Sequence, residues 1–376
     1  MRMPHYVTGP VLIAGLALAA AAVSAVPMTA AGASPARPAR PARPASLLTI
    51  GGSLRGVAAT SAGNAWAVGA VGSLTARTLI VHWNGKAWAR VPSPSPGNSG
   101  LYGVAATSAT NAWAVGTTGT SGSRPLILHW NGKTWARVAS PGPANSSLYG
   151  VAATSATNAW AVGDAGSTTL ILHWNGKSWA RVTSPRGFLS GVAATSARNV
   201  WAVGASNTSH TLILHWNGKS WKRSPSPSAR PHFFPFLTSV AATSARRTWA
   251  VGDSTDCGCG PGLSMTLRWT GRAWKKVPSP SPGGGTTLFG VAAVSASRAW
   301  AVGMSGEGDS LTKTVILRWN GRAWARVASP EPRASSGLFA VAITAGGRAW
   351  AVGSSTNKNR GQDQTLILQW NGTSWK

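Results

Sequence analysis

Histidine recurs at one position of a repeated segment, directly before a tryptophan, and this pattern is the one that most resembles a metal site. The four residues are His82, His129, His173 and His215. A zinc ion needs its nitrogen ligands about 2.0–2.1 Å away. In the radial arrangement of strands argued below, equivalent residues of adjacent units lie about 13 Å apart. We therefore predict that these histidines are structural and hold no metal.

Acidic residues are scarce, with 7 Asp and Glu against 35 Lys and Arg in 376 residues and a formal net charge of +28. The acids are Asp164, Asp253, Asp256, Glu307, Asp309, Glu331 and Asp363. Glycoside hydrolysis uses two carboxyl groups about 5–9.5 Å apart. Asp164 and Asp253 share one repeat position two units apart, which predicts a separation of about 16 Å. The sequence also lacks a Gly-x-Ser-x-Gly turn, a phosphate loop and a His-Glu-x-x-His motif. We expect no catalytic residue and no cofactor.

Two cysteines, Cys257 and Cys259, flank a single glycine in a long connection. In an exported chain, an isolated pair favours oxidation to a disulfide. A bridge across one residue is strained and easily reduced. A redox or metal-binding loop is the alternative.

The N-terminus is typical of a targeting segment. Arg2 precedes an apolar run from Val11 to Ala25, which is shorter than the roughly 20 residues of a membrane span. We predict a signal peptide over residues 1–33 and a secreted or cell-wall protein, with an uncleaved membrane anchor as the alternative. Residues 34–46 repeat Pro-Ala-Arg and predict a basic polyproline II linker.

The rest of the chain repeats one unit seven times, and all 21 tryptophans belong to these units. Each unit has a Trp-Ala-Val-Gly core, followed by two tryptophans five residues apart. The core tryptophans are Trp66, Trp113, Trp160, Trp201, Trp249, Trp300 and Trp350. The units open at Leu54, Leu101, Leu148, Leu189, Leu237, Leu288 and Leu338. A period of 41–51 residues is typical of propeller blades.

Four short apolar runs in each unit predict four β-strands. In the first unit these runs are 54–60, 65–69, 78–83 and 86–91. Asn84-Gly85 between the last two runs favours a tight two-residue hairpin. Both faces of these runs are apolar, as stacked blades require. We predict an all-β fold, a seven-bladed β-propeller over residues 47–376 with four antiparallel strands per blade, in preference to a β-solenoid.

The seventh unit is cut short at its outer edge. The chain ends at Lys376, one residue after Trp375, which leaves the last outer strand incomplete. Residues 47–50 are therefore predicted to supply or flank that strand.

The segments NAWAVG and LILHWNGKSW, which recur with small changes over residues 54–376, resemble the secreted Trp-rich propeller repeats of actinobacteria. More distantly, they are similar to Asp-box (bacterial neuraminidase repeat) propellers and photosystem II assembly-factor propellers. The Asp-box pattern is looser than the turn formed by Asn84, Gly85 and Trp88, so the similarity is one of layout. Sialic-acid hydrolysis in Asp-box proteins relies on residues outside the repeats, and the resemblance implies no catalytic residue here.

Comparison of the units separates two kinds of connection. The turns between first and second strands and between third and fourth strands keep a constant length, whereas the other connections vary. Alternate connections of an up-and-down blade lie on opposite faces, so the propeller has a fixed face and a variable face. Binding usually resides in variable loops on a rigid scaffold.

All seven acids fall in variable connections, whereas the fixed turns carry cations. The cations of the third–fourth turns are Lys86, Lys133, Lys177, Lys219, Arg272 and Arg322, and those of the first–second turns are Arg198, Arg246, Arg247, Arg298 and Arg348. We predict that the fixed face binds an anionic cell-wall polymer or an acidic glycan. A solvated surface without a specific ligand is the alternative, and no specific nucleic-acid motif is present.

The residue after each opening leucine varies, although the rest of its strand is nearly invariant. These residues are Arg55, Tyr102, Tyr149, Ser190, Thr238, Phe289 and Phe339. They predict a ring near the axis of the variable face, either a ligand site with aromatics that stack on sugars or a plug of the channel. The sequence thus predicts a monomeric, non-catalytic binding or scaffold propeller with a ligand or protein partner on its variable face. An Asp-box-type glycan-cleaving enzyme, a glycoside hydrolase or lyase, is the alternative.

Overall fold

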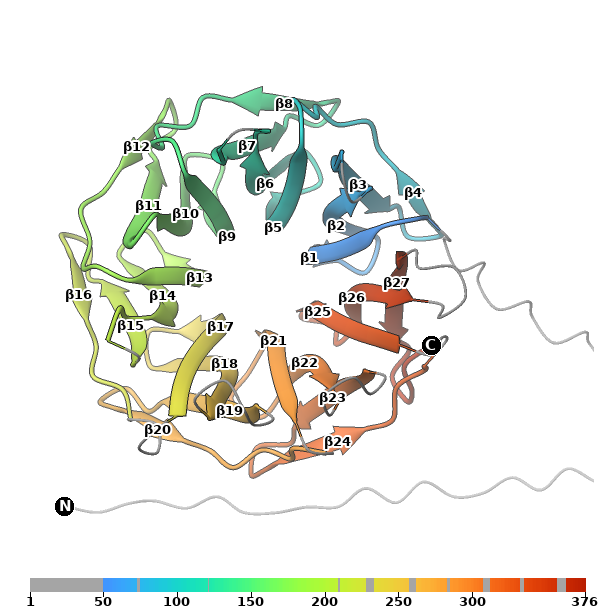
Figure 1. Ribbon diagram of the computed structural model, residues 1–376. Coiled ribbons are helices and arrows are strands. Elements are labelled where there is room, and N and C mark those ends of the chain that lie inside the picture. The colour runs from blue at the N-terminus through green and yellow to red at the C-terminus, as the bar shows by residue number, and fades with distance from the viewer. Residues whose placement is uncertain are drawn as a thin grey trace, which may run out of the picture. The chain divides into compact units, whose positions relative to one another are not determined.

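The computed structural model describes residues 50–72, 75–120, 122–208, 210–227, 233–256, 262–282, 285–306, 312–331, 335–356 and 363–376. They belong to one compact unit, Ala45–Lys376. This unit is the predicted seven-bladed β-propeller, in which blades of antiparallel strands surround a central axis (Figure 1). Within the described ranges, no helix is long and apolar enough to span a membrane. The predicted signal peptide and linker, residues 1–46, lie outside these ranges.

Each blade places its strands from the axis to the rim in chain order. The innermost strands are β1 (Ser53–Ser61), β5 (Ser99–Ser108), β9 (Ser146–Ser155), β13 (Phe188–Ser196), β17 (Phe233–Ser244), β21 (Thr286–Ala293) and β25 (Ser335–Ile343). The second strands are β2 (Asn64–Val71), β6 (Asn111–Thr118), β10 (Asn158–Ala165), β14 (Asn199–Ala205), β18 (Arg247–Asp256), β22 (Ala299–Ser305) and β26 (Ala349–Thr356). The third strands are β3 (Arg77–Trp83), β7 (Arg124–Trp130), β11 (Thr168–Trp174), β15 (Thr211–Trp216), β19 (Leu263–Trp269), β23 (Lys313–Trp319) and β27 (Asp363–Trp370). The outer strands are β4 (Trp88–Arg90), β8 (Trp135–Val138), β12 (Trp179–Arg181), β16 (Trp221–Arg223), β20 (Trp274–Lys276) and β24 (Trp324–Val327).

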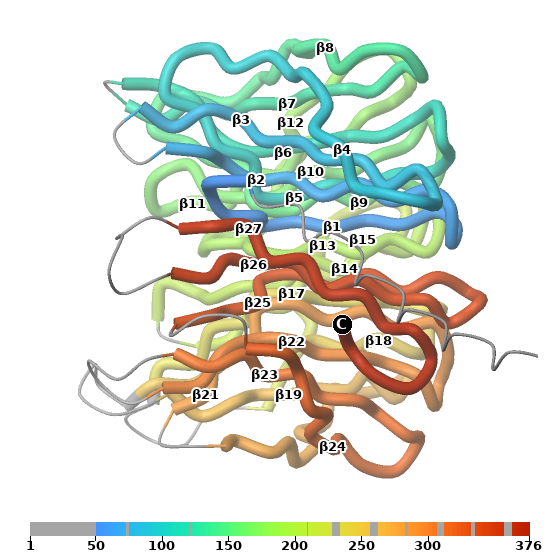
Figure 2. Tube along the Cα trace, turned by 90° about the vertical axis from the view of Figure 1, so that its right-hand side faces the viewer, coloured from blue at the N-terminus to red at the C-terminus, as the bar shows by residue number. Residues whose placement is uncertain are grey.

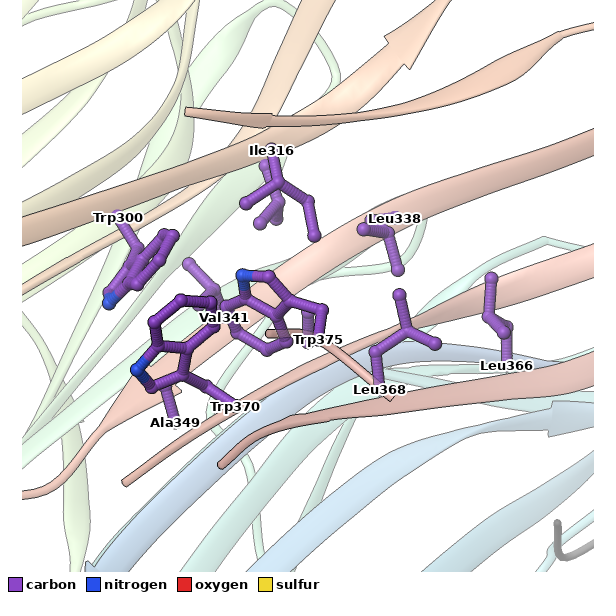
Figure 3. Close-up of a cluster of buried hydrophobic side chains, with 11 residues drawn as sticks. Trp300, Ile316, Leu338, Val341, Ala349, Leu366, Leu368, Trp370 and Trp375 are labelled. Carbon is purple, nitrogen blue, oxygen red and sulfur yellow. The ribbon is translucent and has the colours of Figure 1, made fainter. Parts of the chain in front are cut away.

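Three tryptophans pack together at each of the six interfaces between consecutive blades from one to seven. Trp66 of β2 lies against Trp130 and Trp135 of the second blade, with ring centroids 4.9 and 5.2 Å apart. The six interfaces from blade one to blade seven repeat these separations within 4.8–5.1 Å and 5.0–5.3 Å. Figure 3 shows the last of these clusters, in which Trp300 lies beside Trp370 and Trp375. The core of the propeller is therefore a series of separate clusters between blades.

The hairpin between the third and outer strands differs from the expected two-residue turn. Trp83 pairs directly with Trp88, which leaves a four-residue loop. The Asn84 side-chain Oδ1 accepts hydrogen bonds from the backbone N–H groups of Lys86 and Ala87 at 2.9 and 3.0 Å. Gly85 follows with φ +94°, a conformation that favours glycine. The observed register differs from the expected one by two residues, so each side chain keeps its predicted face.

Each inner strand contains a β-bulge directly after its opening leucine. In the first blade, Leu54 pairs with Gly69 and Gly56 pairs with Val68, so Arg55 is the extra residue. The bulge forces the inner strand close to the second strand: a Cβ on Gly69 would lie 1.9 Å from the Ser53 carbonyl oxygen. The glycine of the Trp-Ala-Val-Gly core is therefore required by this close approach.

The chain's C-terminus completes part of blade seven, whose sheet has only the three strands β25, β26 and β27. Trp375 forms an isolated β-bridge with Trp370. The backbones of Gln369 and Lys376 exchange two hydrogen bonds of 2.8 and 3.0 Å. The outer strand of this blade is thus as short as the sequence indicates.

The N-terminal segment completes the other end of that outer edge. Gly51 forms a β-bridge with Gln364. The Ile50 carbonyl accepts a hydrogen bond of 2.9 Å from the Thr365 N–H. Ile50 also packs against the cluster between blades seven and one. The predicted pairing of the two ends is confirmed at Ile50, whereas residues 47–49 lie outside the described part of the chain.

The interface between blades seven and one is looser than the other six. Trp350 lies 6.4 Å from Trp83. Trp88 is half-buried, whereas the other outer-strand tryptophans are 4–6% exposed. This seam depends more than the others on backbone pairing across it.

Removal of residues 46–50, by starting the chain at Gly51, is expected to lower the free energy of unfolding by about 1–3 kcal/mol. The loss comes from the Ile50 hydrogen bond and its apolar contacts. Chemical denaturation followed by tryptophan fluorescence measures it. A chain that starts at Ser46 is the control and should match one that starts at Ser34; equal stability of all three would contradict the closing role of this segment.

Candidate functional site

The seven bulge residues gather at the axis, where the ring predicted from the sequence is expected. They line an axial cavity of about 200 Å³ together with the residues that follow them on the inner strands. A bulge commonly re-aims a side chain at the rim of a sheet. In every blade the same bulge directs a variable residue of the inner strand to the axis.

The ring divides into two contacting groups. The Arg55 guanidinium lies 4.1 Å from the centroid of the Phe339 ring, and Phe339 in turn contacts Phe289 edge-on at 5.4 Å. Tyr102 and Tyr149 form a second pair, with centroids 5.5 Å apart. A cation held over an aromatic face is attracted to it by the ring quadrupole. These contacts fix a charged group and two phenols at the mouth of the channel.

Thr238, another member of the ring, has a structural role. Its hydroxyl donates to the Leu288 carbonyl of the next blade at 2.6 Å and lies 3.1 Å from the Val251 carbonyl. This residue therefore ties inner strands together and offers little to a ligand.

Two carboxyl groups lie beside the ring. Asp164 is hydrogen-bonded to Tyr149; burial, together with the charge of Asp164, raises the pKa of Tyr149 to about 12, so its phenol is the donor. Asp253 accepts a hydrogen bond of 3.2 Å from the Thr287 hydroxyl. Burial raises the pKa of both carboxyls, opposed by these hydrogen bonds. Each acid thus has its own partner on a different inner strand.

A larger cavity, which sequence reasoning missed, opens beside the ring over blades one and two. Its volume is about 810 Å³, and Arg55 and Tyr102 line it as well as the axial cavity. The residue before each opening leucine borders this region, and it is Ser53 in blade one and Gly100 in blade two. The sequence contains a signal for this difference, because blades four and five carry Phe at the same repeat position.

The cations predicted for the fixed face all lie at its turns and are all exposed. They are Lys86, Lys133, Lys177, Lys219, Arg272, Arg322, Arg198, Arg246, Arg247, Arg298 and Arg348. Backbone N–H groups of Lys86, Lys133, Lys177, Lys219 and Arg322 each donate to the turn asparagine at 2.9 Å. The Asn-Gly turn therefore presents its cation in the same way in successive blades. Figure 2 shows the strands of all blades running between this face and the opposite one.

The repeated histidines have structural partners, as predicted. His82 stacks on Trp66 with centroids 4.1 Å apart, and its Nε2 lies 2.7 Å from Asn64 Oδ1. Because the Asn64 amide donates to Thr60 at 2.7 Å, its Oδ1 faces the histidine and Nε2 is the protonated nitrogen. The same contacts recur at His129, His173 and His215. No group of three or more metal-ligating side chains is found among the described residues.

Several other candidate residues cannot be placed. Cys257 and Cys259, with the disulfide predicted for them, lie outside the described residues, as do Glu307 and Asp309.

Comparison with known proteins finds similarity in fold. No protein-family model and no curated protein matches the sequence. A structure of YCF48 bound to D1 peptide is 14% identical with a TM-score of 0.56, covering 85% of this chain and 93% of that one. The BP39L lectin from Burkholderia pseudomallei is 15% identical with a TM-score of 0.55, covering 87% and 97%. The GH74 xyloglucanase from Xanthomonas campestris is 14% identical with a TM-score of 0.56, covering 85% of this chain and 55% of that one.

At these identities the similarities establish the class of protein, a β-propeller, and nothing about activity. The predicted similarity to other propellers is confirmed at the level of the fold. Export, an actinobacterial origin and a relation to Asp-box repeats remain predictions.

Stability is expected to fall as the pH drops below about 6.5, because burial lowers the pKa of all four repeat histidines from 6.5. The unfolded chain then binds more protons than the folded one, so stability present above pH 6.5 is lost as the pH falls towards the folded pKa values. Replacing the four histidines by Gln, which blade seven carries as Gln369, should flatten this dependence. Thermal midpoints measured from about pH 7.5 to about pH 5 test this. Exposed His210→Gln is the control, and an unchanged slope in the fourfold variant would contradict the prediction.

Proposed function

We propose that this protein is an exported, non-catalytic binding propeller that attaches by its fixed face to an anionic polymer of the cell envelope. Its variable face is left free for a ligand or a protein partner. The observation that carries the proposal is the one-sided distribution of acidic residues: eleven exposed cations lie at the fixed turns, and no acidic residue of the sequence falls there.

The arrangement of the fixed cations suits a polymer better than a small ligand. The turns repeat around the ring, so the positive charges are spread over a broad face and do not converge on one cavity. Such a surface attracts a chain of negative charges over several contacts, each weak and sensitive to salt. The net charge of +28 would also speed the encounter with an anionic surface.

The hydrogen-bond partners of two acids, Asp164 and Asp253, support a non-catalytic role. Asp164 is engaged by Tyr149, and Asp253 by Thr287 of the next blade. A glycosidase needs two carboxyls that flank one bond. The glycan-cleaving alternative would need acids brought together by a bound substrate.

A protein partner on the variable face is supported by exposed apolar side chains over blades four and five. Phe188, Phe234, Phe236 and Leu263 are 37–47% exposed. Exposed aromatic residues are enriched at protein interfaces.

Charge reversal tests the role of the fixed face. The fourfold variant Lys86→Glu, Lys133→Glu, Lys177→Glu and Lys219→Glu keeps the backbone N–H donors of the turns, so the fold should be retained. We expect its affinity for cell-wall preparations that contain anionic polymer to fall at least about tenfold, with a weaker salt dependence. Cosedimentation across a salt series, with polymer-stripped walls for comparison, measures this.

The matched control reverses four exposed cations on the side of the variable connections: Arg77, Arg124 and Lys313, which begin third strands, and Arg186. This variant has the same net charge as the fixed-face variant. If the two variants lose affinity equally, only total charge matters and the fixed face is no docking surface. If the wild-type protein sediments with neither preparation, the proposal fails.

A further inference from the structure

The cavity over blades one and two, which we call the blade 1–2 pocket, differs from the rest of the variable face. It is bordered by Arg55, Tyr102, Asn98, Thr117 and Asp363, with Ser53 and Gly100 among its other residues. Its volume of about 810 Å³ lies within the range of small-molecule sites.

The residue before each opening leucine distinguishes blades one and two, where it lines the pocket, from blades four and five. Blades four and five carry Phe188 and Phe236 there, and these side chains are 37% and 38% exposed. In blade two the same position is Gly100, and a Cβ placed on it would meet nothing closer than 3.7 Å. The backbone therefore tolerates a side chain at this position, and the space is left open by the sequence of blades one and two.

One wall of the pocket carries a positioned cation. The Arg55 guanidinium lies over the Phe339 ring at 4.1 Å, and it forms no salt bridge with any described carboxylate. Stacking leaves the edge of the guanidinium, with its N–H donors, free to bind. That edge fits a carboxylate through two parallel hydrogen bonds.

The adjoining wall carries a phenol ring and polar groups. Tyr102 is half-buried and packs against Tyr149 at 5.5 Å. Asn98 Oδ1 is occupied by the Ala76 N–H at 2.9 Å, which leaves its amide NH₂ as the group free to donate to a ligand. Asp363 accepts a hydrogen bond from the Thr356 hydroxyl at the rim. Such a wall offers a flat apolar surface surrounded by both donors and acceptors.

We infer that the blade 1–2 pocket binds an acidic oligosaccharide, with the carboxylate of one sugar on Arg55 and a sugar ring against Tyr102. A polyhydroxylated ligand uses both donors and acceptors, which the polar wall supplies. A sugar carboxylate uses Arg55, the cation that lines the pocket, whose planar fork is less suited to a neutral ligand. The inference rests on the proposed binding role of the variable face and is independent of the fixed face.

The test is isothermal titration calorimetry of the chain from Ser34 to Lys376 with trigalacturonate and, for comparison, the neutral trisaccharide maltotriose. The salt concentration is kept high enough to suppress binding to the general surface charge. We expect trigalacturonate to bind and maltotriose to bind at least about tenfold more weakly, since a charge-assisted pair is lost.

Two variants and a control locate the site. Arg55→Gln should weaken trigalacturonate binding by roughly ten- to a hundredfold. Gly100→Phe introduces the residue that blades four and five carry at this position, and it should abolish binding by filling the pocket. Arg186→Gln removes an exposed cation of the same face outside the pocket and should bind as the wild type does. Near-ultraviolet circular dichroism of the tryptophans checks that each variant is folded.

Equal binding of the two trisaccharides, or unchanged binding in folded Gly100→Phe, would overturn the inference. No binding of trigalacturonate would do the same. Cosedimentation with cell walls separates this result from the proposed role of the fixed face. The Gly100→Phe variant should still sediment with cell walls. The fourfold Lys→Glu variant should no longer sediment with cell walls but should still bind trigalacturonate.

Discussion

The contact between one tryptophan of a blade and two tryptophans of the next is the interaction on which the whole propeller depends. A single four-stranded blade has two apolar faces and no core of its own, so it is stable only when both faces are covered. The contact of Trp66 with Trp130 and Trp135 covers the wide outer part of that wedge. It repeats at six of the seven interfaces with separations constant within about 0.3 Å, so these blades pack on one another in the same way around the ring.

Packing of the blades at the rim brings the inner strands close together at the axis. Inner strands come so close together that a Cβ on Gly56 would lie 2.9 Å from the carbonyl oxygen of Tyr102 in the next blade. Small residues and a bulge are therefore imposed on every inner strand, and the chain varies most at the bulged residue and at the residue before the opening leucine. The same packing that demands uniform tryptophans at the rim thus leaves one variable ring at the centre, where a ligand can reach it.

The two faces of such a ring are independent surfaces on a rigid frame. In six blades the turn between the third and outer strands is held by an Asn side chain that accepts two backbone N–H groups, which fixes the shape of the hairpin. The exposed side chains of these turns are nevertheless free of packing. The variable connections are under no such restraint, and there the blades differ, with Phe188 and Phe236 on one side of the axis and Gly100 on the other. The proposed docking on one face and ligand binding on the other would rest on this separation.

The number of blades, the strand order, the short last strand and the exposed cations of the fixed turns followed from the sequence alone. These features repeat, and any feature present in seven copies can be recognised from its spacing. The sequence also indicated that His82 and its equivalents are structural, because radial geometry keeps them apart. The hairpin register was wrong by two residues, since the Asn84 side chain builds a wider loop than the Asn-Gly pair suggests. Only the tertiary structure showed that Arg55 is a bulge residue held over Phe339, and that Ser53 and Gly100 leave a pocket beside it. These features depend on contacts of blades one and two with blade seven, which lies at the other end of the chain and meets blade one only when the ring closes.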